Sequence, residues 1–167
     1  GKDYVACLDS AGKVSCFGDS EACKISDNRN IKKIFRASNG LIFLYNDSTL
    51  GYSGSFIGTS SLKQHQNIID VASSDNLLVI LNNDGRLKVY SKGSENYLIA
   101  EKWSDIVYVA CGDDFVAGLD KYGKVHIEIE NDQIIETVNT WNNVIAIDAA
   151  SNYLIAYNSR KIMGVGK

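Results

Sequence analysis

The chain of 167 residues contains no proline, one methionine, two tryptophans and two histidines. No apolar run approaches the roughly 20 residues of a membrane-spanning helix, which excludes such a span. With 17 basic and 20 acidic residues the net charge is −3, and no cluster of Lys or Arg provides the basic surface that nucleic acid binding requires. His65 and His126 have no Ser, Cys or metal-ligand partner nearby in the sequence, so we expect structural or surface roles for both. These absences predict a soluble acidic protein without a catalytic site, a metal or a cofactor.

Without proline, and with 14 glycines, the turns need residues that tolerate a positive φ. Three connections, at residues 9–13, 82–86 and 120–124, begin with Asp or Asn and carry Gly near the end. We expect the Asp or Asn side chain to cap each turn and the Gly to be left-handed. The Asn-Asn-Asp-Gly run at 82–85 lacks the spaced acidic ligands and distal Glu of a calcium loop, so it predicts a turn.

A hairpin phrase recurs about every 37 residues along the chain. Its closing apolar residue falls at positions 14, 50, 87, 125 and 162, in steps of 36, 37, 38 and 37. The second and fifth copies, at residues 43–50 and 155–162, are looser, and each has a connection one residue shorter. Such a period predicts stacked or radial repeats, in which no copy buries its apolar face alone.

Each repeat joins an apolar-x-x-apolar segment to two short strands, whose alternation is clearest at residues 87–90 and 125–128. No helical pattern is expected between them. A β-propeller blade needs about 40 residues, whereas a β-helix coil needs fewer and a sandwich needs no repeat. We therefore predict an all-β fold of β-propeller blades of about 37 residues, in four to five repeats. The expected single array, residues 1–167, has a half blade at 1–27 and blades at about 28–64, 65–102, 103–140 and 141–167.

These phrases resemble the regulator of chromosome condensation repeat in its bacterial form. The resemblance covers the whole chain and is most specific at residues 103–112, 118–125 and 141–147. It implies a propeller that acts through protein contacts, including nucleotide exchange on a small GTPase. The family commonly has a histidine before the second-half strand, and apolar or aromatic groups would replace it here at Tyr4, Leu41, Leu77, Phe115 and Tyr153. That loss, the acidic charge and the incomplete ring disfavour the exchange function.

An open array of blades leaves the apolar faces of its end sheets uncovered. Four first halves and five second halves are present, so the expected propeller is partial, small or completed by oligomerisation. Three alternatives for what covers these end faces stay open: the remaining blades of a longer parent chain, a second copy of this chain, or closure into a small ring of four blades.

We expect a non-enzymatic scaffold that mediates protein–protein interaction, with an unidentified protein partner. Candidate contact residues are Phe56 and Ile57, in the Gly/Ser-rich stretch 54–61, and Trp103 and Trp141, which share one phase of the repeat. Because an aromatic rim also suits sugars, a carbohydrate-binding surface protein is the alternative. It requires both tryptophans to be exposed, whereas packing between neighbouring blades would bury them.

The four cysteines are Cys7, Cys16, Cys23 and Cys111. Cys7 and Cys16 flank one hairpin, but its expected inward set ends in Cys16 and sends Cys7 to the other face, so a Cys7–Cys16 disulfide needs a register shift of one residue. Cys23 and Cys111 are expected to be buried thiols. No Cys-x-x-Cys pair suggests zinc. Free thiols favour a cytoplasmic location, with secretion or the cell surface left open.

Overall fold

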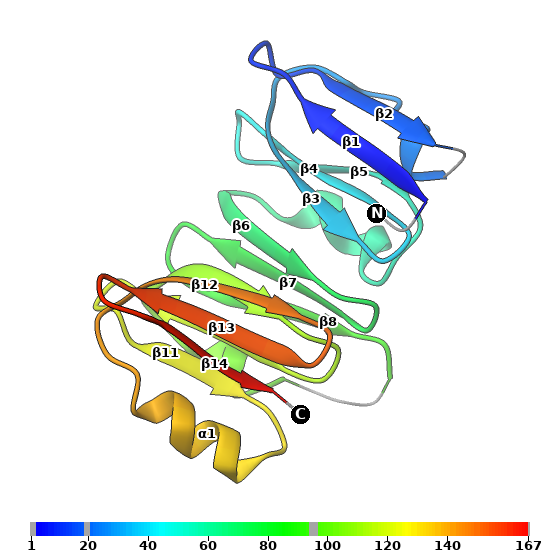
Figure 1. The fold of residues 1–167 in the computed structure, drawn as a ribbon. Helices are drawn as coiled ribbons and strands as arrows, with labels where there is room; N and C mark the ends of the chain where they lie inside the picture. Colours follow the sequence, from blue (N-terminus) through cyan, green and yellow to red (C-terminus); the bar gives the residue numbers. More distant parts are fainter. Residues whose placement is uncertain (1–2, 19–20, 94–96, 167) are drawn as a thin grey trace. The chain divides into compact units, whose positions relative to one another are not determined.

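The computed structural model describes residues 3–18, 21–93 and 97–166. They form five small antiparallel sheets, each made of strands that are consecutive in the chain (Figure 1). The chain divides into two compact units, residues 1–69 and 70–167. We number the sheets I to V in chain order. Unit 1 holds sheets I and II, and unit 2 holds most of sheet III and all of sheets IV and V. The predicted all-β fold is confirmed.

The strands of the five sheets have the following bounds. Sheet I is β1 (Tyr4–Leu8) and β2 (Val14–Gly18); sheet II is β3 (Ile31–Ala37), β4 (Gly40–Tyr45) and β5 (Leu50–Gly54); sheet III is β6 (Ile68–Ser73), β7 (Leu77–Asn82) and β8 (Leu87–Ser91); sheet IV is β9 (Ile106–Cys111), β10 (Val116–Asp120) and β11 (Val125–Glu128); sheet V is β12 (Val144–Ala150), β13 (Tyr153–Asn158) and β14 (Ile162–Gly166). Short 3-10 helices occur at η1 (Glu21–Cys23), η2 (Thr59–Gln64) and η3 (Ala100–Lys102).

The predicted hairpin turns are confirmed in sheets I, III and IV. Asp9 Oδ1 accepts hydrogen bonds of 2.9 Å from the backbone N–H groups of residues 11 and 13. Asp120 Oδ1 accepts the equivalent pair from residues 122 and 124, also at 2.9 Å, and Asn82 Oδ1 accepts one from residue 86. The glycines near the turn ends have φ values of 76°, 74° and 84°, at Gly12, Gly85 and Gly123. The run at 82–85 is thus part of a turn, as its sequence predicts.

Sheet II differs from the prediction by one residue. Leu44 pairs with Leu50, as Leu8 pairs with Val14 in sheet I. The turn bonds from Tyr45 N to Thr49 O and from Ser48 N to Tyr45 O match those of sheet I, so this connection is not shorter. Ser48, with φ 65°, takes the left-handed position. The residue equivalent to Tyr4 is therefore Gly40 and not Leu41; the shorter connection occurs only in sheet V, where Asn158 N donates to Lys161 O.

The turns of sheets I to IV are each hydrogen-bonded to the first strand that follows them. The backbone N–H of Ile31 donates to Gly12 O at 3.0 Å, and the same bond recurs from Ile68 to Ser48, Ile106 to Gly85 and Val144 to Gly123, at 3.0 to 3.3 Å. The residue before each of these strands has a positive φ of 53° to 62°, at Asn30, Asn67, Asp105 and Asn143. Asn and Asp tolerate this conformation better than other side chains. The Asx before every first strand is a repeated signal that the sequence interpretation missed.

The core consists of contacts between one face of a sheet and one face of the next. We call the face that packs against the following sheet the forward face and the opposite one the backward face. The forward face of sheet IV (Phe115, Ala117, Leu119, Val125) shares a buried cluster with the backward face of sheet V (Leu154, Ala156, Met163). Sheet III (Leu77, Val79, Leu81, Leu87) packs in the same way on sheet IV (Val109, Cys111, Val116). So does sheet I (Tyr4, Ala6, Leu8, Val14) on sheet II (Leu41, Phe43, Tyr45).

One α-helix, α1 (Asp132–Asn139), lies beside β11 and contradicts the expectation that no helix separates the strands (Figure 1). Asn131 caps it, because its side-chain oxygen accepts a hydrogen bond of 3.0 Å from Ile134 N. Ile134 and Val138, one helical turn apart, are buried in the cluster between sheets IV and V. The Asx cap and this i, i+4 pair are signals that could have predicted the helix.

The cysteines pair differently from the prediction. Cys16 forms a disulfide with Cys23, which joins β2 to η1. The predicted register is confirmed, since Ala6 pairs with Cys16 and Cys7 pairs with Ser15, and as this register indicates Cys7 and Cys16 form no disulfide; Cys7 is an exposed thiol. The expectation that Cys23 is a buried thiol is wrong. Cys111 is the buried thiol that we expected, and burial raises its pKa to about 12. Because two of the four cysteines are oxidised, the argument from free thiols for a cytoplasmic location no longer holds.

Candidate functional site

The predicted contact loop does not present free apolar side chains. Phe56 and Ile57 are both partly buried. The Phe56 ring packs edge-on against Tyr52, with 6.0 Å between ring centroids, and lies over Gly40, where any Cβ would collide with it. Thr59 fastens the loop, since its hydroxyl donates to Phe56 O and accepts from Phe56 N. These contacts give the loop a structural role within unit 1.

The two tryptophans do not form an aromatic rim. Trp141 is 6% exposed and belongs to the cluster between sheets IV and V. Trp103 is partly buried and packs against the cluster between sheets III and IV, with its ring centroid 5.5 Å from that of His126. The carbohydrate alternative required both rings to be exposed, so the burial of Trp141 removes its basis.

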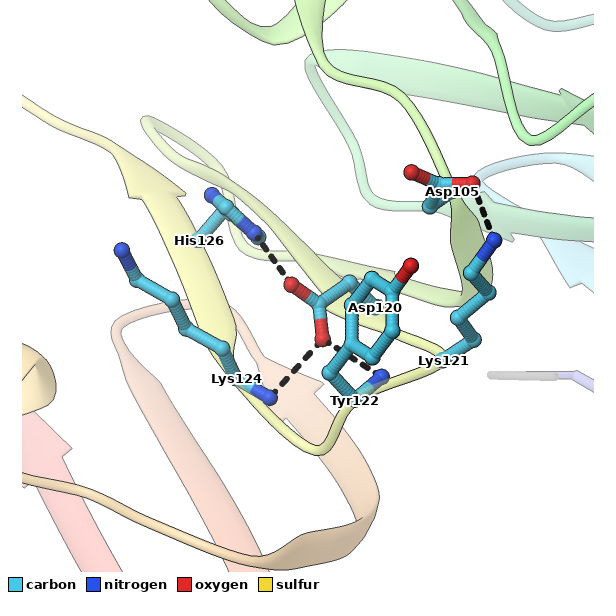
Figure 2. A network of polar contacts seen from close by, with 6 residues as sticks. All are labelled: Asp105, Asp120, Lys121, Tyr122, Lys124 and His126. Carbon is cyan, nitrogen blue, oxygen red and sulfur yellow. Dashed lines mark hydrogen bonds and ion pairs between the residues drawn. The ribbon is translucent and has the colours of Figure 1, made fainter.

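A network of polar contacts lies at the turn of sheet IV (Figure 2). The Trp103 ring packs beside one of its members, His126. His126 Nε2 lies 2.9 Å from Asp120 Oδ2, and the other oxygen of Asp120 accepts the two turn amides described above. Burial would raise the pKa of Asp120, but the hydrogen bonds from His126 and from these amides outweigh it and lower the pKa below its ordinary value. Lys121 Nζ meets Asp105 Oδ1 at 2.7 Å on the outer side of the turn.

The contacts of this network support the hairpin turn of sheet IV. They hold residues 120–124 in place, and Gly123 in that turn binds Val144 at the start of sheet V.

Among the described residues, no three His, Cys, Asp or Glu side chains are grouped so as to hold a metal ion. A pocket of about 510 Å³ lies beside the next turn, lined by residues 140–143, 158–161 and Met163. In the described ranges no helix is long and apolar enough to cross a membrane.

The most distinctive surface is the forward face of sheet V, which we call the terminal face. Tyr153, Ile155 and Tyr157 project from alternate positions of β13 and are 48%, 39% and 45% exposed, and Ile162 of β14, paired with Tyr157, is 74% exposed. On the neighbouring strand β14, Gly164 lies opposite Ile155 and Gly166 lies opposite Tyr153. The face therefore presents four large aliphatic or aromatic side chains on the paired strands β13 and β14.

The equivalent residues of the preceding sheets in unit 2 are all buried. Phe115, Ala117 and Leu119 stand in the same register of sheet IV and are 0–2% exposed, as are Leu77, Val79 and Leu81 of sheet III. In both cases the following sheet covers them. In β13 and β14 the terminal face thus has the composition of a covered face. On β12 it differs, because the exposed Asp148 lies opposite Ile155, where sheet IV has Ala110 opposite Ala117.

Comparisons with known proteins identify the architecture. No protein-family model matches the chain, and no curated protein matches it by sequence. Similar solved structures include the entire ectodomain of the receptor kinase CR4 from Physcomitrella patens, at 15% identity and a TM-score of 0.77, over 98% of this chain and 49% of that one. The CRINKLY WD40 ectodomain of the Arabidopsis thaliana receptor kinase ACR4 has 12% identity and a TM-score of 0.71, over 98% and 60%.

A third similar structure is that of yeast RCC1 (Prp20) bound to Kap60, at 13% identity and a TM-score of 0.71, over 99% of this chain and 54% of that one. The five sheets are β-propeller blades, and sheets I to V are called blades I to V from here on. The chain spans about half to three fifths of the length of the propeller proteins that it matches. At these identities the similarity establishes the fold.

The sequence predicted that the end blades would have uncovered faces, but it did not predict which residues form them. The signal was available in the fifth hairpin phrase, where Ile155 and Tyr157 hold the positions of Ala117 and Leu119. The loop and the tryptophans were selected for size and spacing, which do not reveal whether a neighbouring blade covers a side chain.

Proposed function

We propose that this chain is a non-enzymatic β-propeller scaffold, built from repeats of the regulator of chromosome condensation type, that binds another protein through its terminal face. The exposed ladder of Tyr153, Ile155, Tyr157 and Ile162 carries the proposal. Burial of an apolar side chain of this size contributes roughly 1.5–3 kcal/mol, and tyrosines are enriched among the residues that dominate protein interfaces.

The chemistry of the partner follows from what covers the equivalent residues elsewhere in unit 2. There, a β-sheet presents alternating aliphatic side chains such as Leu154 and Ala156 of blade V. The partner of the terminal face should therefore offer an apolar β-sheet face of similar width. Gly164 and Gly166 favour such a partner, because they leave the backbone of β14 open to close approach.

A scaffold needs no reactive group, and the polar network at blade IV is accounted for by turn support. Similarity to yeast RCC1 at 13% identity extends to the fold, and nucleotide exchange is not part of the proposal. Phe56 and Ile57 remain a secondary candidate contact, through the part of their side chains that the blade leaves accessible.

The experiment compares three forms of the immobilised chain in extract of the source cells: wild type, Ile155→Lys and Tyr122→Lys. Tyr122 is the matched control, because it is 74% exposed at the turn of blade IV and lies outside the terminal face. The proposal expects a protein that wild type and Tyr122→Lys retain and Ile155→Lys loses. Titration of that protein, once purified, should show at least about tenfold weaker binding to Ile155→Lys. Equal retention by all three forms would refute the terminal face as the binding surface.

A further inference from the structure

A second blade face that no other sheet of its unit covers belongs to blade I, in unit 1. Its backward face carries Val5 and Cys7 on β1 and Phe17 on β2, and Val5 and Phe17 are 63% and 68% exposed. The residues that hold the place of Val5 in the other four blades, Leu41, Leu78, Val116 and Leu154, are 0–3% exposed. Blade I is also two-stranded in the described residues, so β1 pairs only with β2 there and keeps a free edge.

We propose that the terminal face of one copy of this chain docks on the backward face of blade I of a second copy, in a head-to-tail contact. This proposal rests on the proposed function, because it names the partner of the terminal face. The chain makes the same kind of contact within its units three times, from blade I to II, III to IV and IV to V. The two uncovered faces are one half each of that repeated contact.

The side chains suit this arrangement. In the repeated contact, apolar groups of the forward face share a buried cluster with apolar groups of the next backward face, as Phe115 and Leu119 do with Leu154 and Ala156. Both uncovered faces offer apolar groups, among them Tyr153 and Tyr157 on the terminal face and Val5 and Phe17 on blade I. Val5, Cys7 and Phe17 carry no charge. On the terminal face, Asp148 of the edge strand β12 lies opposite Ile155, so its carboxylate must stay at the rim of the contact, in water.

The contact joins two different patches, so it is heterologous. Such contacts form closed rings when the rotation between copies closes, and otherwise form larger assemblies. In an open assembly, the two end copies each keep one unused face until a ring closes. The mass of the wild-type chain should therefore rise above 18.3 kDa with concentration, to a fixed multiple if the assembly closes and continuously if it does not.

The test uses two variants that each remove one half of the contact. Ile155→Lys alters the terminal face and leaves blade I intact, whereas Phe17→Lys alters blade I and leaves the terminal face intact. Sedimentation velocity should show each variant alone as a monomer at concentrations where the wild type associates. An equimolar mixture should form a heterodimer of twice 18.3 kDa and nothing larger, because one intact contact is left between the two variants. Tyr122→Lys should associate like the wild type.

Both substituted side chains are exposed, so circular dichroism should match the wild type; Tyr157→Ser and Val5→Ser provide a milder second pair with the same expected pattern. A wild-type chain that stays monomeric up to near-millimolar concentration overturns the inference. So does a mixture in which neither variant pair forms a heterodimer, and so does association that Tyr122→Lys abolishes as well.

The two proposals fail in different ways. If the wild type is monomeric but the extract yields a protein that Ile155→Lys alone fails to retain, the second copy is wrong and the scaffold function stands. If the variants complement each other and the extract yields only further copies of this chain, the self-contact stands and the binding of a different protein through this face is wrong.

Discussion

Two neighbouring residues of β13 provide a direct test of the covering of blade V. Leu154 is 1% exposed and packs in the cluster between blades IV and V, while Ile155, the next residue, points to the uncovered terminal face. Leu154→Ala should lower the free energy of unfolding by about 3 kcal/mol, within the range of 2–5 kcal/mol for buried leucines. Ile155→Ala should lower it by about 1 kcal/mol or less, because much of the side chain stays in water in the folded state.

Urea unfolding followed by tryptophan fluorescence is the suitable assay. Both tryptophans, Trp103 and Trp141, lie in unit 2, and Trp141 shares the cluster of Leu154. With a slope of about 1–3 kcal/mol per molar urea, a loss of 3 kcal/mol lowers the midpoint by about 1–3 M. The measurement belongs at low protein concentration, where the terminal face of a free chain has no cover.

Equal losses for the two variants, or a larger loss for Ile155→Ala, would refute the assignment of forward and backward faces. Repetition of the assay at high protein concentration adds a second reading. If a second copy covers the terminal face, the loss caused by Ile155→Ala should grow with concentration, whereas the loss caused by Leu154→Ala should not.

Two further predictions concern the cysteines and the turn of blade IV. In the absence of reductant, a thiol reagent should modify Cys7 in the folded chain and Cys111 only after unfolding. Reduction of the Cys16–Cys23 disulfide should lower the free energy of unfolding by about 2–3 kcal/mol for a loop of this length. Four reactive thiols before reduction would contradict the pairing. Because the pKa of Asp120 is lowered in the folded state, its charge stabilises the fold above the ordinary carboxyl pKa of about 3.9, and this contribution is lost as the pH falls through the folded-state value. The wild type should thus be more stable than Asp120→Asn at pH 7, and urea midpoints that fail to converge on acidification below about pH 4 would contradict this account.

The hairpins were predictable because their signals are local. An Asp or Asn that caps its own turn and a Gly with positive φ need no tertiary contact, so the turns at 9–13, 82–86 and 120–124 follow from the sequence. The phase of blade II was not predictable in this way. All residues of β4 from Gly40 to Leu44 are buried, so the apolar run fits either face and alternation gives no register.

The disulfide and the tryptophans depend on parts of the structure that spacing does not reveal. Connectivity among four cysteines cannot be deduced from sequence, and Cys23 reaches Cys16 through η1, which no sequence pattern announced. Trp141 is buried in a cluster to which Ile134 and Val138 of α1 contribute, so the unpredicted helix helps to explain why this candidate contact residue lies in the core.

The covering of each forward face by the next blade has a consequence for the evolution of repeat number. If the chain lost residues 141–167, the new end would be Phe115, Ala117 and Leu119, which are now buried and at least as apolar as the terminal face. If it gained a repeat, Tyr153 and Tyr157 would be covered and the added repeat would supply the open face. Within a unit, each blade therefore shields the apolar face of the blade before it, so a change in the number of blades always moves an apolar face that needs a cover to a different blade.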